Sequence, residues 1–257
     1  MTKTMVRRWT EGRLGGRMPD QVLVEEPMEI RLEDTPVATT MRTPGHDYEL
    51  AVGFCHTEGL LAGFPVVDVR YCALGAASDA NWNVVSVSTG GKAPEPATRL
   101  GVTTAACGWC GTDTIDDLGT RWPPLEPVEV DWGVVASVGD VVVSAQGLFD
   151  VTGGAHAAAA FDLTSGDVLL VREDIGRHNA IDKVIGRLVL DGSLPVRGLG
   201  LWASSRLGYE LVAKAWSAGF SAIVAVGPAS SLAVETARRA NLPAAGFARG
   251  GTLVVYG

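Results

Sequence analysis

Short apolar runs alternate with polar residues through the first part of the chain, and a longer, more regular rhythm begins after about residue 155. From Val22 to Met41, β-favouring runs are separated by Glu, Asp and Pro, which predicts a meander of short strands. Apolar positions over residues 50–61 recur with helical spacing, and further strands are expected near Val66–Ala73 and Val84–Ser88. The first part is therefore expected to be β-rich, with one amphipathic helix.

In the second part of the chain, segments with the periodicity of a strand alternate with segments that have the periodicity of a helix. Apolar residues over 134–149 fall on helical spacing and predict a helix, although their β-branching favours strand. After it we expect strands at Ala155–Phe161, Val168–Arg172, Gly198–Ala203, Ala222–Val226, Ala244–Phe247 and Leu253–Tyr256, with helices at Asn179–Leu190, Leu207–Ala218 and Ser231–Ala240. This alternation predicts an α/β fold in which helices cover a mixed sheet.

Loop-forming residues suggest where the units begin and end. Residues 1–18 are polar and rich in Gly and Arg, and they are expected to form a mobile tail. Pro123–Pro127 has the composition of a linker. We therefore expect a smaller β-rich N-terminal subdomain over residues 19–122 and a C-terminal α/β subdomain over residues 128–257.

Composition and charge narrow the class of protein. Apolar residues make up 47% of the chain, yet no stretch approaches the roughly 18 to 20 apolar residues of a membrane span, and the basic N-terminus lacks the apolar run of a signal peptide. A cytoplasmic protein is expected. Residues 1–150 carry 11 Lys/Arg and 21 Asp/Glu, whereas residues 151–257 carry 10 and 8. The acidic first half argues against nucleic-acid binding, and the second half suits a phosphate-bearing ligand better.

Two of the four cysteines have a spacing that suggests chemistry. The loop Cys107-Gly108-Trp109-Cys110-Gly111 contains glycines that let the backbone turn tightly, which favours exposure. A thiolate there can attack a sulfur donor, hold the extra sulfur and release it to an acceptor. A structural metal site or an inert pair is the alternative, although one C-x-x-C alone cannot complete a tetrahedral zinc site.

A different function is suggested by His56-Thr57-Glu58. H-x-E followed by C-x-x-C is the pattern of zinc nucleobase deaminases, in which His56, Cys107 and Cys110 would bind zinc and Glu58 would move protons. Two features oppose it: Ala106 stands where that signature has proline, and the gap of about fifty residues is long. We favour the simpler interpretation, that His56 is a polar position on an amphipathic helix, and expect no bound metal.

A dense polar segment follows one of the predicted strands. The run from Arg172 to Lys183 leaves an apolar strand and opens a helix, which is where ligands bind in open α/β sheets. Gly176 permits a close approach of the backbone, and amides at a helix start suit phosphate. The simpler alternative is an exposed, salt-bridged turn.

Three further segments combine glycines or small residues with a functional group. Arg249 beside two glycines in Phe247–Thr252 offers a planar cationic fork for phosphate or a guanine edge. Thr152–His156 and Ser204–Arg206 have the same character. Each can also be a plain turn or hairpin.

Together and in this order, the motifs resemble the formate dehydrogenase accessory sulfurtransferase family, known as FdhD, from about Glu26 to Gly257. The resemblance rests on Met41–Gly45, Gly53-Phe54, Glu58-Gly59, Cys107–Gly111, Thr152–His156, Arg172–Lys183 and Gly246–Gly251. The combination is specific, whereas no single piece is.

The resemblance implies a fold similar to cytidine deaminases, used without the deaminase reaction. Family members look like persulfide carriers between a cysteine desulfurase and the molybdenum bis(molybdopterin guanine dinucleotide) cofactor of formate dehydrogenase. By position, Cys107 matches the persulfide cysteine and Cys110 its partner, and a homodimer is expected. The matching cofactor-binding segment is Phe247, Ala248, Arg249, Gly250, Gly251 and Thr252. We expect this loop and the Arg172–Lys183 turn to form a crevice for the guanine dinucleotide, to which Gly176, Arg177, His178, Lys183 and Arg206 contribute.

Some positions depart from the family pattern. Where the family has Ser-Gly-Arg-x-Ser, this chain has Ser204-Ser205-Arg206-Leu207-Gly208, which adds bulk at Ser205 and removes a hydroxyl at Gly208. His56-Thr57 replaces an apolar residue followed by serine and thereby creates the H-x-E pattern. Three hypotheses remain open: a sulfurtransferase that relays persulfide sulfur, a zinc-dependent deaminase-type hydrolase, and a cofactor chaperone that moves no sulfur.

Overall fold

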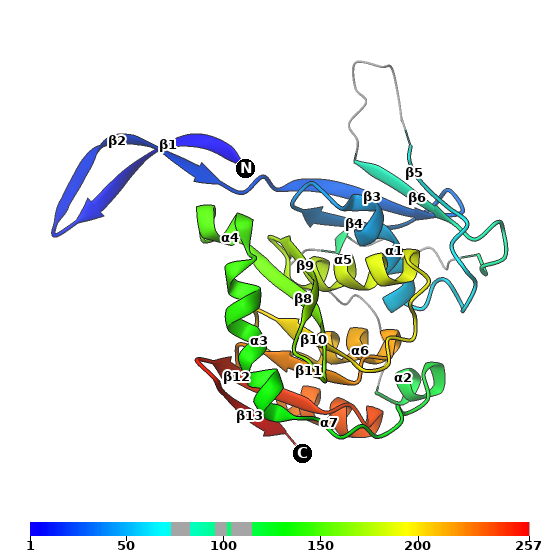
Figure 1. Cartoon of the computed structure of the whole chain (residues 1–257). Coiled ribbons are helices and arrows are strands. Elements are labelled where there is room, and N and C mark those ends of the chain that lie inside the picture. The colour runs from blue at the N-terminus through cyan, green and yellow to red at the C-terminus, as the bar shows by residue number, and fades with distance from the viewer. Residues whose placement is uncertain (73–82, 96–101, 104–114, 257) are drawn as a thin grey trace.

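Two β-sheets with helices packed between them form the body of the protein, and a two-stranded hairpin projects from it (Figure 1). The computed structural model describes residues 1–72, 83–95, 102–103 and 115–256. None of the helices in these ranges is long and apolar enough to span a membrane.

The C-terminal sheet has six strands in the order β13-β12-β11-β10-β8-β9. Its strands are β8 (His156–Asp162), β9 (Val168–Asp174), β10 (Leu199–Ala203), β11 (Ala222–Ala225), β12 (Ala244–Arg249) and β13 (Thr252–Tyr256). Strands β10, β11 and β12 are parallel, and β8 is antiparallel to both β10 and β9. The carboxyl ends of β9, β10, β11 and β12 therefore lie along one edge of the sheet, which we call the strand-end edge.

Helices cover both faces of this sheet because side chains alternate along each strand. Leu201 and Ile223 point to the face covered by α5 (Arg177–Leu190), α6 (Tyr209–Ala218) and α7 (Ser231–Ala240). Trp202 and Val224 point to the opposite face, where Val138 of α3 (Trp132–Ser144) packs against them. Both sets of side chains are buried, so the strands carry nearly continuous apolar runs.

The N-terminal sheet has the order β5-β6-β3-β4-β7. Its strands are β3 (Glu26–Leu32), β4 (Thr35–Arg42), β5 (Asp68–Tyr71), β6 (Val84–Ser88) and β7 (Val102–Thr103). Helix α1 (Asp47–Thr57) covers it and shares a core with Met28, Ile30 and Val85. This subdomain is β-rich and smaller, as predicted.

A glycine–glycine crossing joins the two subdomains. Helix α1 crosses α5 where Gly53 faces Gly186. A β-carbon on Gly53 would overlap the main-chain carbonyl of Asp182 in α5, and a β-carbon on Gly186 would overlap that of Glu49 in α1. Backbone-to-backbone contact at this point requires glycine on both helices. The crossing fixes the N-terminal sheet over the start of α5.

The strands and helices expected in the C-terminal half are confirmed, except that one expected helix is divided into two. The helix expected over 134–149 is broken near Ala145, so that α3 is followed by a short α4 (Gly147–Thr152). The proline-rich segment packs against the C-terminal subdomain: Trp216 donates its indole N–H to the Pro123 carbonyl (2.9 Å), and Leu118 of α2 (Ile115–Arg121) joins the C-terminal core.

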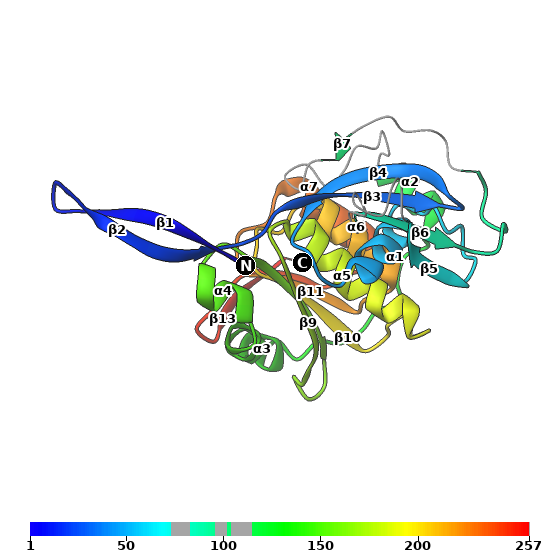
Figure 2. The same ribbon diagram turned by 90° about the horizontal axis from the view of Figure 1, so that it is seen from above.

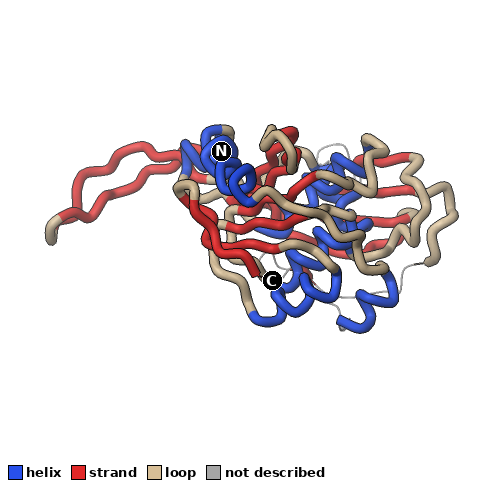
Figure 3. The backbone as a smooth tube through the Cα atoms, turned by 60° about the horizontal axis from the view of Figure 1, so that its bottom comes forward, coloured by secondary structure: helices blue, strands red, loops and turns tan. Residues whose placement is uncertain are grey.

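Residues 1–18, for which a mobile tail is expected, have strand structure. These residues belong to an antiparallel hairpin of β1 (Thr2–Thr10) and β2 (Arg13–Val22) (Figures 2 and 3). The sequence pattern did not predict these strands. Almost every side chain of the hairpin is exposed, so apolar and polar residues do not alternate along the strands.

Candidate functional site

Five segments of the C-terminal half meet at the strand-end edge. They are the turn into α5, the loops into α6 and α7, the β12–β13 hairpin and the residues just before β8. Since α5, α6 and α7 all begin here, their N-terminal amides and positive dipole ends lie along this edge. The edge therefore favours an anionic ligand.

The crevice expected between the Arg172–Lys183 turn and the Phe247–Thr252 loop has a different shape. Both segments lie on the strand-end edge, but β8, β10 and β11 stand between β9 and β12. Four strand spacings correspond to about 19 Å. The two segments are thus opposite ends of one long edge and not two walls of a narrow cleft.

The turn into α5 is built around the buried carboxylate of Asp174. It accepts hydrogen bonds from the main-chain N–H groups of Thr43 (3.0 Å) and Gly176 (2.8 Å) and from the Asn179 side chain (3.0 Å). It also pairs with the ammonium of Lys183 at 2.7 Å. The carboxylate holds the glycine of the turn in place.

Lys183 serves the turn and is not exposed at the edge. Its side chain is 1% exposed, and besides Asp174 its ammonium contacts the carbonyl oxygens of Thr43 (3.0 Å) and Glu173 (3.3 Å). Three contacts use its three N–H donors. A ligand role for Lys183 would require this buried ion pair to open, at a cost of several kcal/mol.

The first two charged residues of this segment, Arg172 and Glu173, are also bound within the protein. Arg172 makes a two-point ion pair with Glu49 of α1, at 2.5 and 2.8 Å. The Glu173 carboxylate accepts the main-chain N–H groups of Leu148 and Phe149, each at 2.8 Å, and so completes the start of α4. The simpler reading of a solvated surface turn is therefore wrong, because these contacts join three elements.

His156, at the start of β8, lies between this turn and the loop into α6. Its Nδ1 is 3.1 Å from the Ser204 hydroxyl, which also accepts the N–H of Ala157 at 2.9 Å. Burial and the positive charge of Arg177 lower the pKa of His156, and Asp174 opposes them. Sequence reasoning singled out this glycine-containing motif but gave the histidine no role.

The loop into α6 is held by main-chain contacts and presents Arg206 to solvent. The Ser205 carbonyl accepts the N–H of Gly227 at 2.9 Å, and a β-carbon on that glycine would lie 2.9 Å from Arg206 Cα. Helices α5 and α6 begin at Gly176 and Gly208, neither of which supplies a side-chain cap. A glycine at the N-cap lets the backbone of the loop approach closely where each helix begins.

The β12–β13 hairpin offers an exposed aromatic ring beside a cation. Phe247 has a left-handed backbone (φ 54°) and is 50% exposed as a residue, and its N–H donates to the Gly227 carbonyl at 3.1 Å. A left-handed phenylalanine is strained, and such strain concentrates at functional loops. Arg249 is exposed, and Gly250 and Gly251 have open space around them.

The predicted ligand residues therefore divide by exposure. Arg206, Phe247, Arg249, Gly250, Gly251 and Thr252 are exposed and Arg177 is partly buried, whereas Gly176, His178, Lys183 and Ala248 are buried. The buried group shapes the edge, and Ala248 belongs to the core under α3. Cys107 and Cys110 lie outside the described residues.

The H-x-E residues lie at the other end of the helical layer. His56 is near the C-terminus of α6, where its Nε2 is 3.0 Å from the Ser217 carbonyl. It lines a cavity of about 540 Å³ together with Arg121 and Trp122. Burial lowers the pKa of His56, and the Ser217 contact opposes this shift. Since Nε2 donates to a carbonyl, the lone pair of the neutral ring is on Nδ1.

No group of three or more His, Cys, Asp and Glu side chains suitable for a metal ion occurs in the described ranges. The complete set proposed for zinc includes the two loop cysteines, which those ranges do not contain.

Comparison with known proteins identifies a family. Residues 23–257 match the model of the FdhD/NarQ family. The chain is 45% identical over 244 residues to the sulfur carrier protein FdhD of Corynebacterium efficiens, which covers 90% of this chain and 87% of that one. It is 40% identical over 249 residues to the sulfur carrier protein FdhD of Mycobacterium tuberculosis, with 93% and 90% covered.

A solved structure has the same fold. The crystal structure of a candidate formate dehydrogenase accessory protein from Desulfotalea psychrophila superposes with a TM-score of 0.73 at 20% identity, over 99% of this chain and 96% of that chain. The described helices and strands therefore follow an arrangement already seen in a crystal.

Proposed function

The chain belongs to the FdhD/NarQ family, and from this membership we propose that it is a sulfur carrier. Cys107 takes sulfur from a cysteine desulfurase as a persulfide. The sulfur then passes to the molybdenum bis(molybdopterin guanine dinucleotide) cofactor, the cargo of the reaction, before that cofactor enters formate dehydrogenase. The sulfurtransferase works in the cytoplasm.

The two cysteines suffice for a balanced transfer. The Cys107 thiolate attacks the outer sulfur of the donor persulfide, whose S–S bond breaks and leaves a thiolate on the desulfurase. Cys110 then attacks the inner sulfur of the Cys107 persulfide, and the outer sulfur departs as sulfide toward molybdenum. The two cysteines are oxidised to a disulfide as that sulfur is reduced, and a thiol reductant restores them.

Chain connectivity supports a meeting of this loop with the strand-end edge. Thr103 pairs with Thr40 of β4, whose hydroxyl is 3.3 Å from the Asn179 side chain in the first turn of α5. Cys107 follows Thr103 by four residues, which span at most about 14 Å when extended. The proposed persulfide is thus within reach of the start of α5.

The exposed groups of the edge suit the cargo. Arg206 and Arg249 are cations near glycine amides, and they can bind phosphates with charge-assisted hydrogen bonds. The exposed ring of Phe247 offers a surface on which a guanine can stack. The roughly 19 Å width of the edge suits a long ligand with several phosphates better than a small anion.

One observation carries the proposal: the family match covers both the C-G-W-C-G motif and every segment of the strand-end edge. A carrier must hold sulfur and receive its acceptor, and the chain offers one segment for each task. A chaperone that only binds the cofactor would need the edge alone.

Intact mass spectrometry separates a carrier from a chaperone. The full chain is incubated with a cysteine desulfurase and L-cysteine, and we expect the mass to rise by one sulfur atom. Cys55→Ser is the matched control, because burial raises the pKa of the Cys55 thiol and keeps it unreactive. No gain in mass, with a desulfurase that releases sulfide normally, would contradict the proposal.

A further inference from the structure

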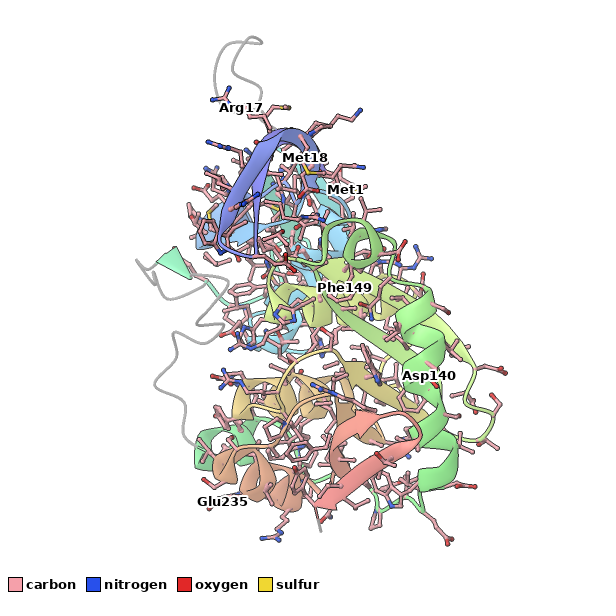
Figure 4. All side chains as sticks on the ribbon, turned by 90° about the vertical axis from the view of Figure 1, so that its left-hand side faces the viewer. Met1, Arg17, Met18, Asp140, Phe149 and Glu235 are labelled. Carbon is pink, nitrogen blue, oxygen red and sulfur yellow. The ribbon has the colours of Figure 1, made fainter. Side chains whose placement is uncertain are left out.

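The β1–β2 hairpin projects away from the body, and we call residues 2–22 the arm (Figures 1 and 2). Its strands of nine and ten residues have exposed side chains throughout, except that Val6 is partly buried. In Figure 4, Arg17 and Met18 stand on the arm, well apart from Asp140 and Glu235 on the body. The match to the FdhD/NarQ family begins at residue 23, after the arm.

An arm of this kind is poorly supported by its own chain. A two-stranded hairpin alone is at best marginally stable in water. The arm is a two-stranded sheet, so the outer edges of both strands carry unpaired main-chain groups. Trp9 is 65% exposed and Met5 59%, and Leu14 opposite Trp9 is 50% exposed. A partner that covers these side chains would stabilise the arm.

The charges of the arm indicate what kind of partner fits. It carries five Lys/Arg and two Asp/Glu, a formal charge of +3, while residues 23–257 carry 16 and 27, a charge of −11. Arg7 and Arg17 lie directly opposite each other in the register. Like charges in this position repel each other. An acidic surface in contact with the two arginines would reduce this repulsion and would also bind the arm.

We propose that the arm clasps a second copy of this chain, so that each copy lays its arm on the acidic body of the other. The acidic excess lies in residues 23–150, which carry 6 Lys/Arg and 19 Asp/Glu, a formal charge of −13, and a two-fold axis would form the contact with the arm twice. The same acidic body would repel a nucleic acid. This contact is independent of the sulfur chemistry.

The first experiment measures the dimer dissociation constant of the full chain by sedimentation, at low and high salt. We expect a dimer that weakens with salt. Arg7→Glu/Arg17→Glu should raise the dissociation constant by about tenfold or more. Arg187→Glu/Arg197→Glu changes the net charge equally on exposed arginines of the body and should leave the constant within about twofold. Trp9→Ala, which changes no charge, should also weaken the dimer, with melting curves confirming that each variant folds.

The second experiment maps the contact. A photo-crosslinking residue replaces Trp9 in a mixture of light and ¹⁵N-labelled chains, and we expect crosslinks that join a light arm to a heavy body. A monomeric parent, an equal effect of the arm and body variants, or crosslinks only within one chain would each overturn the proposal. So would crosslinks from position 9 to a different protein alone.

Discussion

A single carboxylate, that of Asp174, organises the turn that opens α5. It has contacts with two main-chain amides, the Asn179 side chain and the Lys183 ammonium, and it is fully buried. Such a group is stable because every contact satisfies part of its charge. At the residue scale, the strand-end edge is thus rigid in its interior and carries its ligand-facing groups on the outside.

The sequence predicted the segment but not the division of labour within it. The apolar strand, the glycine after it and the polar run that follows were enough to predict that the turn into α5 lies at a ligand-binding edge. Neighbouring elements determine whether Lys183 or Arg249 is exposed to solvent. Lys183 is buried because Thr43 of the N-terminal subdomain contacts it, and the local sequence pattern does not show this contact.

Arg249 is the exposed residue whose removal tests the cargo site. Arg249→Ala should weaken binding of GDP, a surrogate for the dinucleotide, by about tenfold or more, because a charge-assisted hydrogen bond contributes roughly 1.5 to 3 kcal/mol. Calorimetric titration measures the affinity. Arg197→Ala, which removes an exposed arginine at the opposite edge of the sheet, is the control. Equal affinities in parent and Arg249→Ala would place the ligand elsewhere.

Glu33 makes stability depend on pH at the β3–β4 turn. Burial alone would raise its pKa, but hydrogen bonds from Thr89, Ser88 and Gly91 lower the pKa to about 2 from 4.5. Because the pKa is depressed in the fold, the stabilisation is present above pH 4.5 and is lost as the pH falls toward 2. After a discount for solvent screening, Glu33→Gln should cost about 1 to 2 kcal/mol at pH 7.

Urea denaturation at pH 7 and pH 3 checks this dependence. The difference between parent and Glu33→Gln should shrink at the lower pH. Glu126→Gln removes a carboxylate that is 74% exposed and should change little at either pH. A difference for Glu33→Gln that is the same at both values would contradict the account.

At the scale of elements, the crossing of α1 and α5 ties the two sheets together. Both glycines are visible in the sequence as interruptions of helical patterns, yet the pattern alone does not say that they meet. The strands and helices of the C-terminal half were predictable because their apolar periodicity is strong. The arm was not, since both of its faces are exposed.

The crossing should not tolerate a side chain. Gly53→Ala would place a methyl group on the Asp182 carbonyl and force the helices apart, and we expect a loss of about 3 kcal/mol in the free energy of unfolding. Gly139→Ala is the matched control, because its β-carbon would lie 3.5 Å from the Trp202 indole nitrogen, an ordinary contact. That change should be neutral or stabilise by up to about 1 kcal/mol. Equal stabilities of the two variants would refute the close crossing.

At the scale of the whole molecule, sulfur loading and cargo binding fall on separate segments. The sequence placed both cargo segments on strand ends but could not order the strands, so β8, β10 and β11 between them were unforeseen. The H-x-E residues lie far from this edge, at the C-terminal end of α6. The arm adds a surface outside the matched family region.

The metal content of the purified full-length chain tests the alternative that the protein is a zinc hydrolase. We expect elemental analysis of the purified protein to show no stoichiometric zinc, because Ala106 stands where the deaminase signature has proline and the gap of about fifty residues is long. About one zinc per chain, lost in His56→Ala, would contradict this and favour the deaminase-type mechanism.

The central claim is that Cys107 holds the persulfide, and peptide-resolved mass spectrometry after desulfurase loading tests it most directly. Alkylation before digestion keeps the extra sulfur on the cysteine that carries it. We expect the added sulfur on Cys107 in the parent and in Cys110→Ser, and none in Cys107→Ser. An added sulfur that stays in Cys107→Ser and disappears in Cys110→Ser would reverse the assignment.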